Sequence, residues 1–247
     1  MRVVITGASS GIGAALARHY AQQASVLGLI SRRKVEGIGN QVVSYAVDVT
    51  DEAALAAAAQ DFIRRFGPPD LVIANAGIAS GTSGADPGDI AKLKRILDVN
   101  VAGLAATLAA FAPAMRAAGH GTLAGIASVG GFRGLAGNGA YCASKSAAIT
   151  WMESLRAELY GSGVSVVCIC PGYVDTPLTR VNRWPMPFLL SPDEAARRIA
   201  RAIAARRRLA VVPWQMAMVS VLLRALPGWL YDRIASRAPR KPRDVPI

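Results

Sequence analysis

A glycine-rich turn follows directly behind the first apolar run of this chain. The run Arg2–Thr6 reads as a buried strand, and Gly11–Gln22 reads as the helix behind it. Gly7, Gly11 and Gly13 lie at the turn between them. This spacing permits a tight strand-to-helix turn and lets the backbone approach a pyrophosphate, which the free N–H groups of a helix N-terminus can bind. The turn therefore predicts a nucleotide site at the start of an α/β domain.

Apolar runs alternate with helical periodicity along the rest of the chain, which has 247 residues. This length suits one domain with a large core. We predict an α/β fold: a single-domain, Rossmann-type, doubly wound parallel β-sheet flanked by helices. Further strands are expected at Ser25–Ile30, Val42–Val47, Leu71–Ala74, Thr122–Ala127, Val164–Cys170 and Leu209–Val212, and helices at Glu52–Phe66, about Asp89–Ala118, from Gly139 onward, and Pro192–Arg207.

A serine, a tyrosine and a lysine form a second pattern. Ser128 ends an expected strand, and Tyr141 follows thirteen residues later on a helix that also carries Lys145. Positions i and i+4 share a helix face. A free phenol has a pKa near 10, and we expect the lysine ammonium to lower the pKa of Tyr141 by favouring the phenolate. Tyr141 would then exchange a proton with a substrate oxygen that Ser128 stabilises by a hydrogen bond.

Together these motifs resemble the short-chain dehydrogenase/reductase family over roughly residues 1–213. The resemblance implies that Lys145 also holds the nicotinamide ribose and that Asn100 holds a water between this lysine and solvent. It implies that Asp48 contacts the adenine, and that Val174 and Thr176 contact the carboxamide. The resemblance thus gives the catalytic set Asn100, Ser128, Tyr141 and Lys145, and the cofactor set Gly7, Ser9, Ser10, Gly11, Ile12, Gly13, Arg32, Arg33, Asp48, Val49, Asn75, Ala76, Gly77, Tyr141, Lys145, Pro171, Gly172, Val174 and Thr176.

The residues behind the second expected strand bear on the choice of cofactor. Sites that prefer NAD usually place an acidic residue there to hold the ribose hydroxyls. This chain has Arg32 and Arg33 instead. A guanidinium binds a 2′-phosphate through paired hydrogen bonds, so we predict NADP(H), with Arg32 as the leading contact. Two surface arginines at the start of a loop are the alternative.

Two later segments depart from a generic nucleotide fold. Residues 177–190 lie where the resemblance places a substrate lid, and their apolar, proline-rich sequence favours a lipophilic substrate over plain packing onto the core. Residues 214–236 follow as an apolar helical extension, and residues 237–247 as a basic, flexible tail. The extension could lie on a membrane surface, contact a second subunit or cover the cleft, and all three interpretations stay open.

Charge is concentrated at the C-terminal end. The formal net charge is +12, and the stretch from Arg197 to Arg243 contains twelve arginines and lysines but one acidic residue, Asp232. This asymmetry favours an anionic partner, such as an anionic membrane surface, over a solvated face without a specific role. No stacking aromatics are interleaved with the arginines, so we expect no nucleic-acid partner. No His/Cys spacing or acidic cluster predicts a metal site.

These observations lead to one main functional hypothesis. We predict an NADP(H)-dependent oxidoreductase that interconverts a carbonyl and a secondary alcohol on a small lipophilic substrate. Alternatives are a 3-oxoacyl-thioester reductase acting on a carrier-bound substrate, and a non-catalytic NADP(H)-sensing regulator. The resemblance implies a homodimer or tetramer. Three cysteines, no long uninterrupted apolar run and a first apolar run too short for a signal peptide favour a cytoplasmic protein without a spanning helix, peripheral on the inner membrane face.

Overall fold

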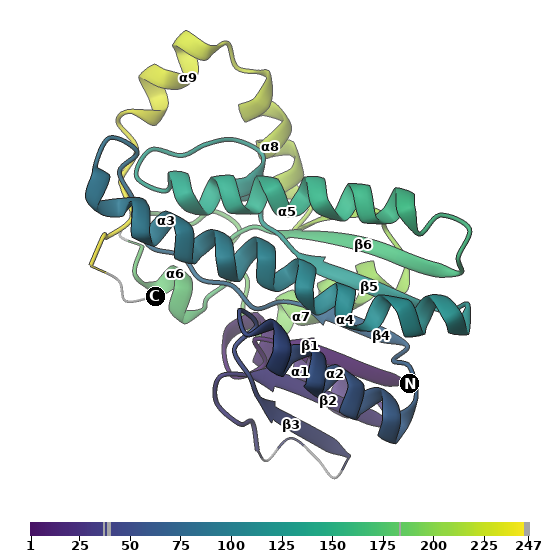
Figure 1. The fold of residues 1–247 in the computed structure, drawn as a ribbon. Coiled ribbons are helices and arrows are strands. Elements are labelled where there is room, and N and C mark those ends of the chain that lie inside the picture. Colours follow the sequence, from purple (N-terminus) through teal and green to yellow (C-terminus); the bar gives the residue numbers. More distant parts are fainter. Residues whose placement is uncertain (37, 39–40, 183, 245–247) are drawn as a thin grey trace.

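Seven parallel strands form one sheet in a computed structural model that describes residues 1–36, 38, 41–182 and 184–244 (Figure 1). Their order is β3-β2-β1-β4-β5-β6-β7, so the chain winds outward in both directions from β1 and β4. This is the doubly wound sheet that the sequence predicts. The strands are β1 (Arg2–Thr6), β2 (Val26–Ser31), β3 (Val42–Ala46), β4 (Leu71–Ala74), β5 (Gly121–Ile126), β6 (Val164–Pro171) and β7 (Leu209–Val212).

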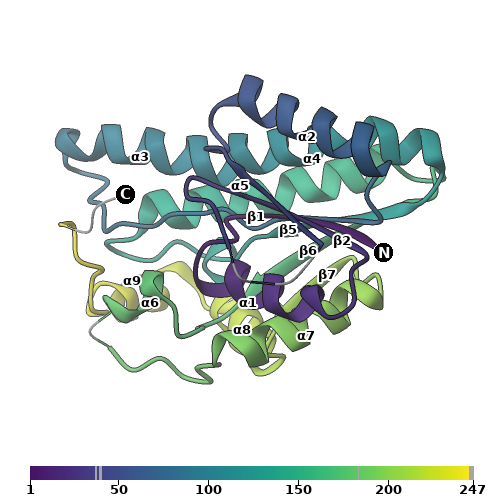
Figure 2. The ribbon, with the colours of Figure 1, turned by 90° about the horizontal axis from the view of Figure 1, so that it is seen from below.

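Helices cover both faces of the sheet (Figure 2). One face carries α1 (Gly11–Ala21) and α7 (Pro192–Ala204), which pack on each other. The other carries α2 (Glu52–Phe66), α4 (Gly103–Ala118) and α5 (Gly139–Glu158). Two separate clusters of buried apolar side chains result, one on each face. Burial on both faces explains why the strands read as nearly continuous apolar runs.

The long helix expected at Asp89–Ala118 is interrupted. It consists of α3 (Ile90–Leu97), a wider π-helical turn at Asp98–Ala102 and α4. Such π turns occur as single turns inside α-helices and often at functional sites. Asn100 lies in this turn and is fully buried. The orientation of the Asn100 side chain therefore depends on this π turn, and an unbroken α-helix would point it in another direction.

One helical stretch among the described residues, Pro87–Ala118, is long and apolar enough to cross a membrane on length and composition alone. Its residues Leu104, Leu108, Phe111 and Met115 are buried in one of the two sheet-side clusters. In this fold the stretch is a core helix, because its apolar face packs on the sheet.

The C-terminal part adds elements beyond the sheet. After the short helix α6 (Pro177–Arg180), α7 and β7, the chain forms α8 (Gln215–Ala225) and α9 (Gly228–Ala235). These two helices project beyond the sheet layers (Figure 1). They form a pair that we call the C-terminal hairpin, residues 214–235. The basic tail was expected to be flexible, but its residues 240–243 contact the rest of the protein, and Lys241 is buried. Its last residues, 245–247, and Arg183 of the expected lid lie outside the described residues.

Candidate active site

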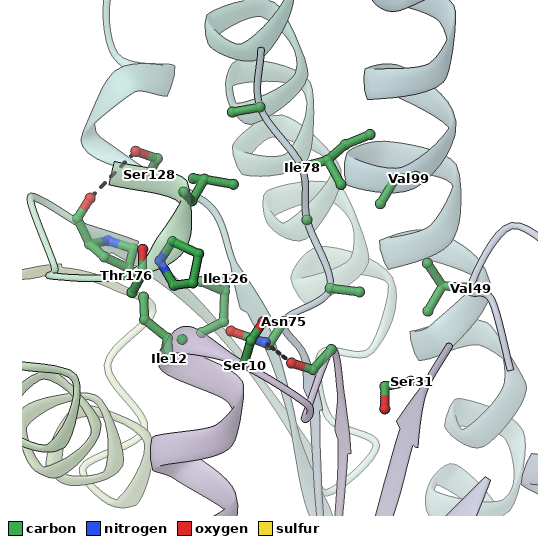
Figure 3. A pocket seen from close by; sticks show the side chains of 18 of the residues that line it. Ser10, Ile12, Ser31, Val49, Asn75, Ile78, Val99, Ile126, Ser128 and Thr176 are labelled. Carbon is green, nitrogen blue, oxygen red and sulfur yellow. Dashed lines mark hydrogen bonds between the residues drawn. The ribbon is translucent and has the colours of Figure 1, made fainter. Parts of the chain in front are cut away.

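A cavity of about 470 Å³ opens at the carboxyl ends of the central strands. In open α/β sheets ligands bind at this edge, where the strand order reverses between β1 and β4. Ser31 and Val49 lie at one end of the cavity, and Ser128 and Thr176 at the other (Figure 3). The residues expected to bind the nucleotide and those expected to transfer a proton therefore line the same cavity.

The glycine turn is packed too closely to hold side chains. A Cβ on Gly13 would lie 2.2 Å from the Gly7 carbonyl oxygen and 2.5 Å from Nδ2 of Asn75. Asn75 donates from Nδ2 to the carbonyl oxygen of Thr6 at 3.0 Å, and the buried Thr6 hydroxyl accepts from the backbone N–H groups of Asn75 and Ala76. These bonds tie the end of β1 to the end of β4. The resulting backbone cradle fits a pyrophosphate, which needs close approach to the main chain.

The N-terminus of α1 faces the cavity. Its N-cap residue Ser10 is extended, and its side chain makes no capping hydrogen bond. The first-turn N–H groups of a helix have no partner within the helix and favour an anion. Gly11, with a φ of +53°, sits opposite Thr176, whose Cγ2 would be 3.2 Å from a Cβ at that glycine. The glycine turn and the segment behind β6 therefore meet across the cavity.

The far end of the cavity is cationic. Arg32 lines it, whereas Arg33 does not, and both are exposed. Asp48 also lines it and forms an ion pair with Arg95 of α3 at 3.0 Å. Burial would raise the pKa of Asp48, but hydrogen bonds from Thr50 and the charge of Arg95 outweigh this effect and hold the pKa below its usual value. Among the described residues no carboxylate lies within 4 Å of the Arg32 guanidinium, so its charge is free for a ligand.

Ser128 and Tyr141 meet at the other end. Ser128 begins the short turn η3 (Val129–Gly131), and its hydroxyl accepts from the Gly130 N–H at 3.1 Å and donates to the Pro171 carbonyl at 3.4 Å. A Cβ on Gly130 would lie 3.5 Å from this hydroxyl oxygen and 3.3 Å from Cε1 of Tyr141, so the two side chains are neighbours. Both side chains line the cavity. Their shared interaction with a single ligand oxygen stays a prediction.

Lys145 is buried one helical turn beyond Tyr141. Its Nζ donates to the Ile126 carbonyl at 2.8 Å and lies 5.8 Å from the centroid of the Tyr141 ring. Burial lowers the pKa of Lys145 to about 8. Burial also raises the pKa of Tyr141 to about 12, and the neighbouring Ser128 hydroxyl only partly opposes this effect. The expected lowering of the tyrosine pKa is thus wrong for this structure, because burial disfavours the charged phenolate.

Asn100 lies behind the cavity wall and joins two parts of it. Its side chain accepts from the Ile78 N–H at 2.8 Å and donates to the Ile78 carbonyl at 3.0 Å. It also donates to the Ser144 hydroxyl at 2.9 Å, and that hydroxyl donates to the Tyr141 carbonyl. The π turn thereby fixes the Ile78 loop to the helix that carries Tyr141. A water-mediated link from Asn100 to Lys145 stays a prediction.

Most of the predicted site residues line this one cavity, and only Gly13, Arg33 and Asn100 do not. Sequence reasoning missed Arg95 and Val99, which share a face of the helix before Asn100 at i and i+4. That spacing is the signal that could have identified them. The other cavity residues that it missed are Ser31, Val47, Ile78, Ala79, Ile126 and Ala127, whereas Pro177, Leu178 and Thr179 belong to the expected lid.

The sequence of this chain is similar to those of known oxidoreductases. The short chain dehydrogenase family matches residues 1–185. An uncharacterized oxidoreductase of Myxococcus xanthus is 38% identical over 243 residues, which are 95% of this chain and 96% of the relative. Estradiol 17-beta-dehydrogenase 11 of Pongo abelii is 30% identical over 237 residues, 91% of this chain and 79% of the relative.

A solved structure shows the same fold. The 3-ketoacyl-(acyl-carrier-protein) reductase of Brucella melitensis, crystallised with NADH, is 27% identical. Its TM-score is 0.77, with 85% of this chain and 95% of the reductase covered. The similarity therefore extends over nearly the whole sheet and its helices.

The lowered pKa of Lys145 predicts how the stability of the protein changes with pH. Below about pH 8 the lysine is charged in both states, and the folded state bears the full cost of burying the charge. Above pH 8 the folded state releases the proton first, so the unfolded state binds more protons and stability rises with pH. Relative to Lys145→Met, the wild type should gain about 1–2 kcal/mol of unfolding free energy between pH 8 and pH 9.5.

Denaturant unfolding of both proteins at several pH values measures this difference. Lys34→Met serves as the control, since Lys34 is exposed. A constant difference between wild type and Lys145→Met across this range would show that Lys145 keeps an ordinary pKa.

Proposed function

The chain belongs to the short-chain dehydrogenase family, and we propose that it is an NADP(H)-dependent oxidoreductase that interconverts a carbonyl and a secondary alcohol. The observation that carries this proposal is that the neighbouring side chains of Ser128 and Tyr141 line the same end of the nucleotide cavity, with Lys145 behind them. A proton donor and an oxygen-stabilising hydroxyl are the groups that carbonyl reduction requires of the protein.

The protein residues divide the work. NADP(H), when bound, supplies or accepts the hydride. Because burial raises the pKa of Tyr141 to about 12, its phenol is protonated at neutral pH and can donate to a carbonyl oxygen. Ser128 stabilises the negative charge that develops on the same oxygen. Lys145 places a positive charge behind the ring, which favours loss of the phenolic proton as the oxygen receives it.

The preference for a 2′-phosphate rests on the cationic end of the cavity. Arg95 is neutralised by Asp48, whereas Arg32 has no described carboxylate partner. Arg32 also lies directly behind Ser31, the last residue of β2, and lines the cavity. A guanidinium in this position suits a phosphate better than the neutral ribose hydroxyls of NAD.

Arg32→Ala should weaken NADPH binding about 10- to 100-fold, because charge-assisted hydrogen bonds to the phosphate are lost. NADH binding should change little. Titration followed by cofactor fluorescence measures both constants. Arg33→Ala is the matched control, since Arg33 does not line the cavity and should have the smaller effect. Equal binding of NADPH and NADH by the wild type would contradict the proposed preference.

Tyr141→Phe should lower the turnover of a carbonyl substrate about 10²- to 10⁴-fold, because the proton donor is removed. NADPH affinity should stay within about threefold, since the ring is kept. Steady-state NADPH oxidation on a panel of lipophilic ketones, with a 3-oxoacyl thioester included, measures the loss. Tyr160→Phe is the control, as this exposed tyrosine lies just beyond the opposite end of α5. Full turnover by Tyr141→Phe would refute the mechanism.

A lipophilic substrate is the second part of the proposal. The lid contributes Pro177 and Leu178 to the cavity wall, and Ile78 and Ala79 line the opposite side. Its outer residues Phe188 and Leu189 are about half exposed. One relative is named for estradiol, an apolar secondary alcohol. These features support a substrate with a large apolar surface.

We further propose that the C-terminal hairpin rests on an anionic membrane surface. Met216 and Ser220 of α8 point inward and are buried. The outer side exposes apolar side chains at helical spacing, and arginines are exposed beside them. Aromatic and apolar side chains flanked by basic residues suit the boundary between lipid headgroups and acyl chains. The exposed apolar residues are Trp214, Met218, Val221, Leu222, Trp229 and Ile234.

The double variant Trp214→Ser/Trp229→Ser should bind vesicles of anionic lipid about tenfold more weakly than the wild type, because two anchoring side chains are lost. Co-sedimentation with phosphatidylglycerol-rich vesicles measures binding, and pure phosphatidylcholine vesicles should bind less protein. Tyr160→Ser controls for the loss of any exposed aromatic side chain. A wild type that binds neither vesicle would exclude the membrane interpretation, and concentration-dependent dimerisation lost in the double variant would assign this face to a second subunit.

A further inference from the structure

The last described residues of the chain are packed against the protein, although their composition predicts a solvated tail. Lys241 is buried, and the Pro242 carbonyl accepts from the Gly81 N–H at 2.9 Å. The packing there is close: a Cβ on Gly81 would lie 2.1 Å from the Lys241 carbonyl oxygen. We refer to residues 240–243 as the C-terminal strap.

The strap connects segments that surround the cavity. Behind β4, Ile78 and Ala79 line the cavity just before Gly81, which the strap holds. On the lid, Leu178 lines the opposite side, and its carbonyl accepts from Nζ of Lys241 at 2.8 Å. The strap therefore spans from one wall of the cavity to the other.

A third contact reaches the catalytic helix. A Cβ on Gly137 would lie 2.7 Å from the Cβ of Arg240, so the strap also packs on the loop just before α5. That loop is already tied to the segment behind β4, because the Thr82 N–H donates to the Gly137 carbonyl at 3.0 Å. The strap thus completes a ring of three segments around the Tyr141 end of the cavity.

Lys241 makes the contact with the lid. Its ammonium donates to the Leu178 carbonyl and, at 3.4 Å, to Oδ1 of Asn182. No described carboxylate lies within 4 Å of it, and burial lowers its pKa to about 8. A buried ammonium is costly unless its hydrogen bonds are made, so its position is explained by the lid oxygens that it binds.

An ion-pair cluster fixes the other end of the strap. Arg243 pairs with Asp89 at 2.8 Å and with Asp86. Lys92 of α3 donates to the Arg243 carbonyl at 2.8 Å and pairs with Asp89 at 3.1 Å. Asp89 is buried and Asp86 is half-buried. Two cations and two carboxylates in one cluster fix the strap more firmly than a single exposed pair would.

From these contacts we propose that the C-terminal strap is the outer wall of the substrate site, and that Lys241 is a positioning residue that holds the lid in place over the cavity. The strap would then limit which carbonyl substrates reach Tyr141. This inference rests on the proposed function for its substrate, but the lid contact itself can be tested without turnover.

Gly81→Ala tests the inference from the side opposite the lid, because the new methyl group must displace the strap. Hydrogen–deuterium exchange should become about tenfold faster or more in peptides covering residues 176–182, since the lid loses its contact with Lys241. Exchange in β4 should stay unchanged and reports that the sheet is intact. Gly84→Ala is the matched control in the same loop, because a Cβ there meets nothing within 4 Å. Unchanged lid exchange in Gly81→Ala, with strap exchange raised, would overturn the proposal.

Lys241→Met removes the donor directly and keeps the apolar length of the side chain. We expect the same faster exchange in the lid, NADPH affinity within about twofold, and a KM for a bulky ketone raised about tenfold at nearly unchanged kcat. Lys94→Met, on α3, is the control. If kcat falls and KM does not, or if lid exchange is unchanged, Lys241 does not position the lid. If the wild type does not bind NADPH, the proposed cofactor is wrong. The exchange rates of the lid then still decide whether Lys241 holds it.

Discussion

The hydrogen bonds that connect the end of β1 to the end of β4 determine how the two halves of the site are placed. The buried Thr6 hydroxyl accepts from two N–H groups of the β4 loop, and Asn75 returns a hydrogen bond to the Thr6 carbonyl. Helix α1 can start this close only because Gly13 has no side chain. The same contact opens the cavity between the two halves of the sheet and aims the N-terminus of α1 into it.

Burial dominates the electrostatics at the opposite end of the cavity. Desolvation destabilises both the Tyr141 phenolate and the Lys145 ammonium, so it raises the pKa of the first and lowers that of the second. At neutral pH the pair is therefore present as phenol and ammonium. This protonation state is suited to donating a proton to a carbonyl oxygen in the proposed reaction.

Local spacing accounts for what the sequence could predict. Parallel strands buried on both faces are nearly continuous apolar runs, so β1, β4 and β7 were located to the residue. The pairing of Tyr141 with Lys145 follows from helix periodicity alone. Long-range contacts account for what was missed. The arginine- and proline-rich end predicts a solvated tail, and only the fold brings Gly81 and the lid close enough to bury Lys241. The tyrosine pKa likewise depends on a burial that no local pattern reveals.

The C-terminal hairpin contacts the loop between Ser128 and Tyr141. Arg133 donates to the Leu223 and Leu226 carbonyls and lies 3.7 Å from the centroid of the Tyr231 ring. It belongs to the loop that joins Ser128 to Tyr141. A surface bound by the hairpin and a substrate bound in the cavity, as proposed, would therefore both act on this loop. Thermodynamic reciprocity then applies: whatever factor the outer surface imposes on substrate affinity, the substrate must impose on adhesion to that surface. An enzyme built in this way would hold its surface more tightly, or more loosely, according to how much substrate is present.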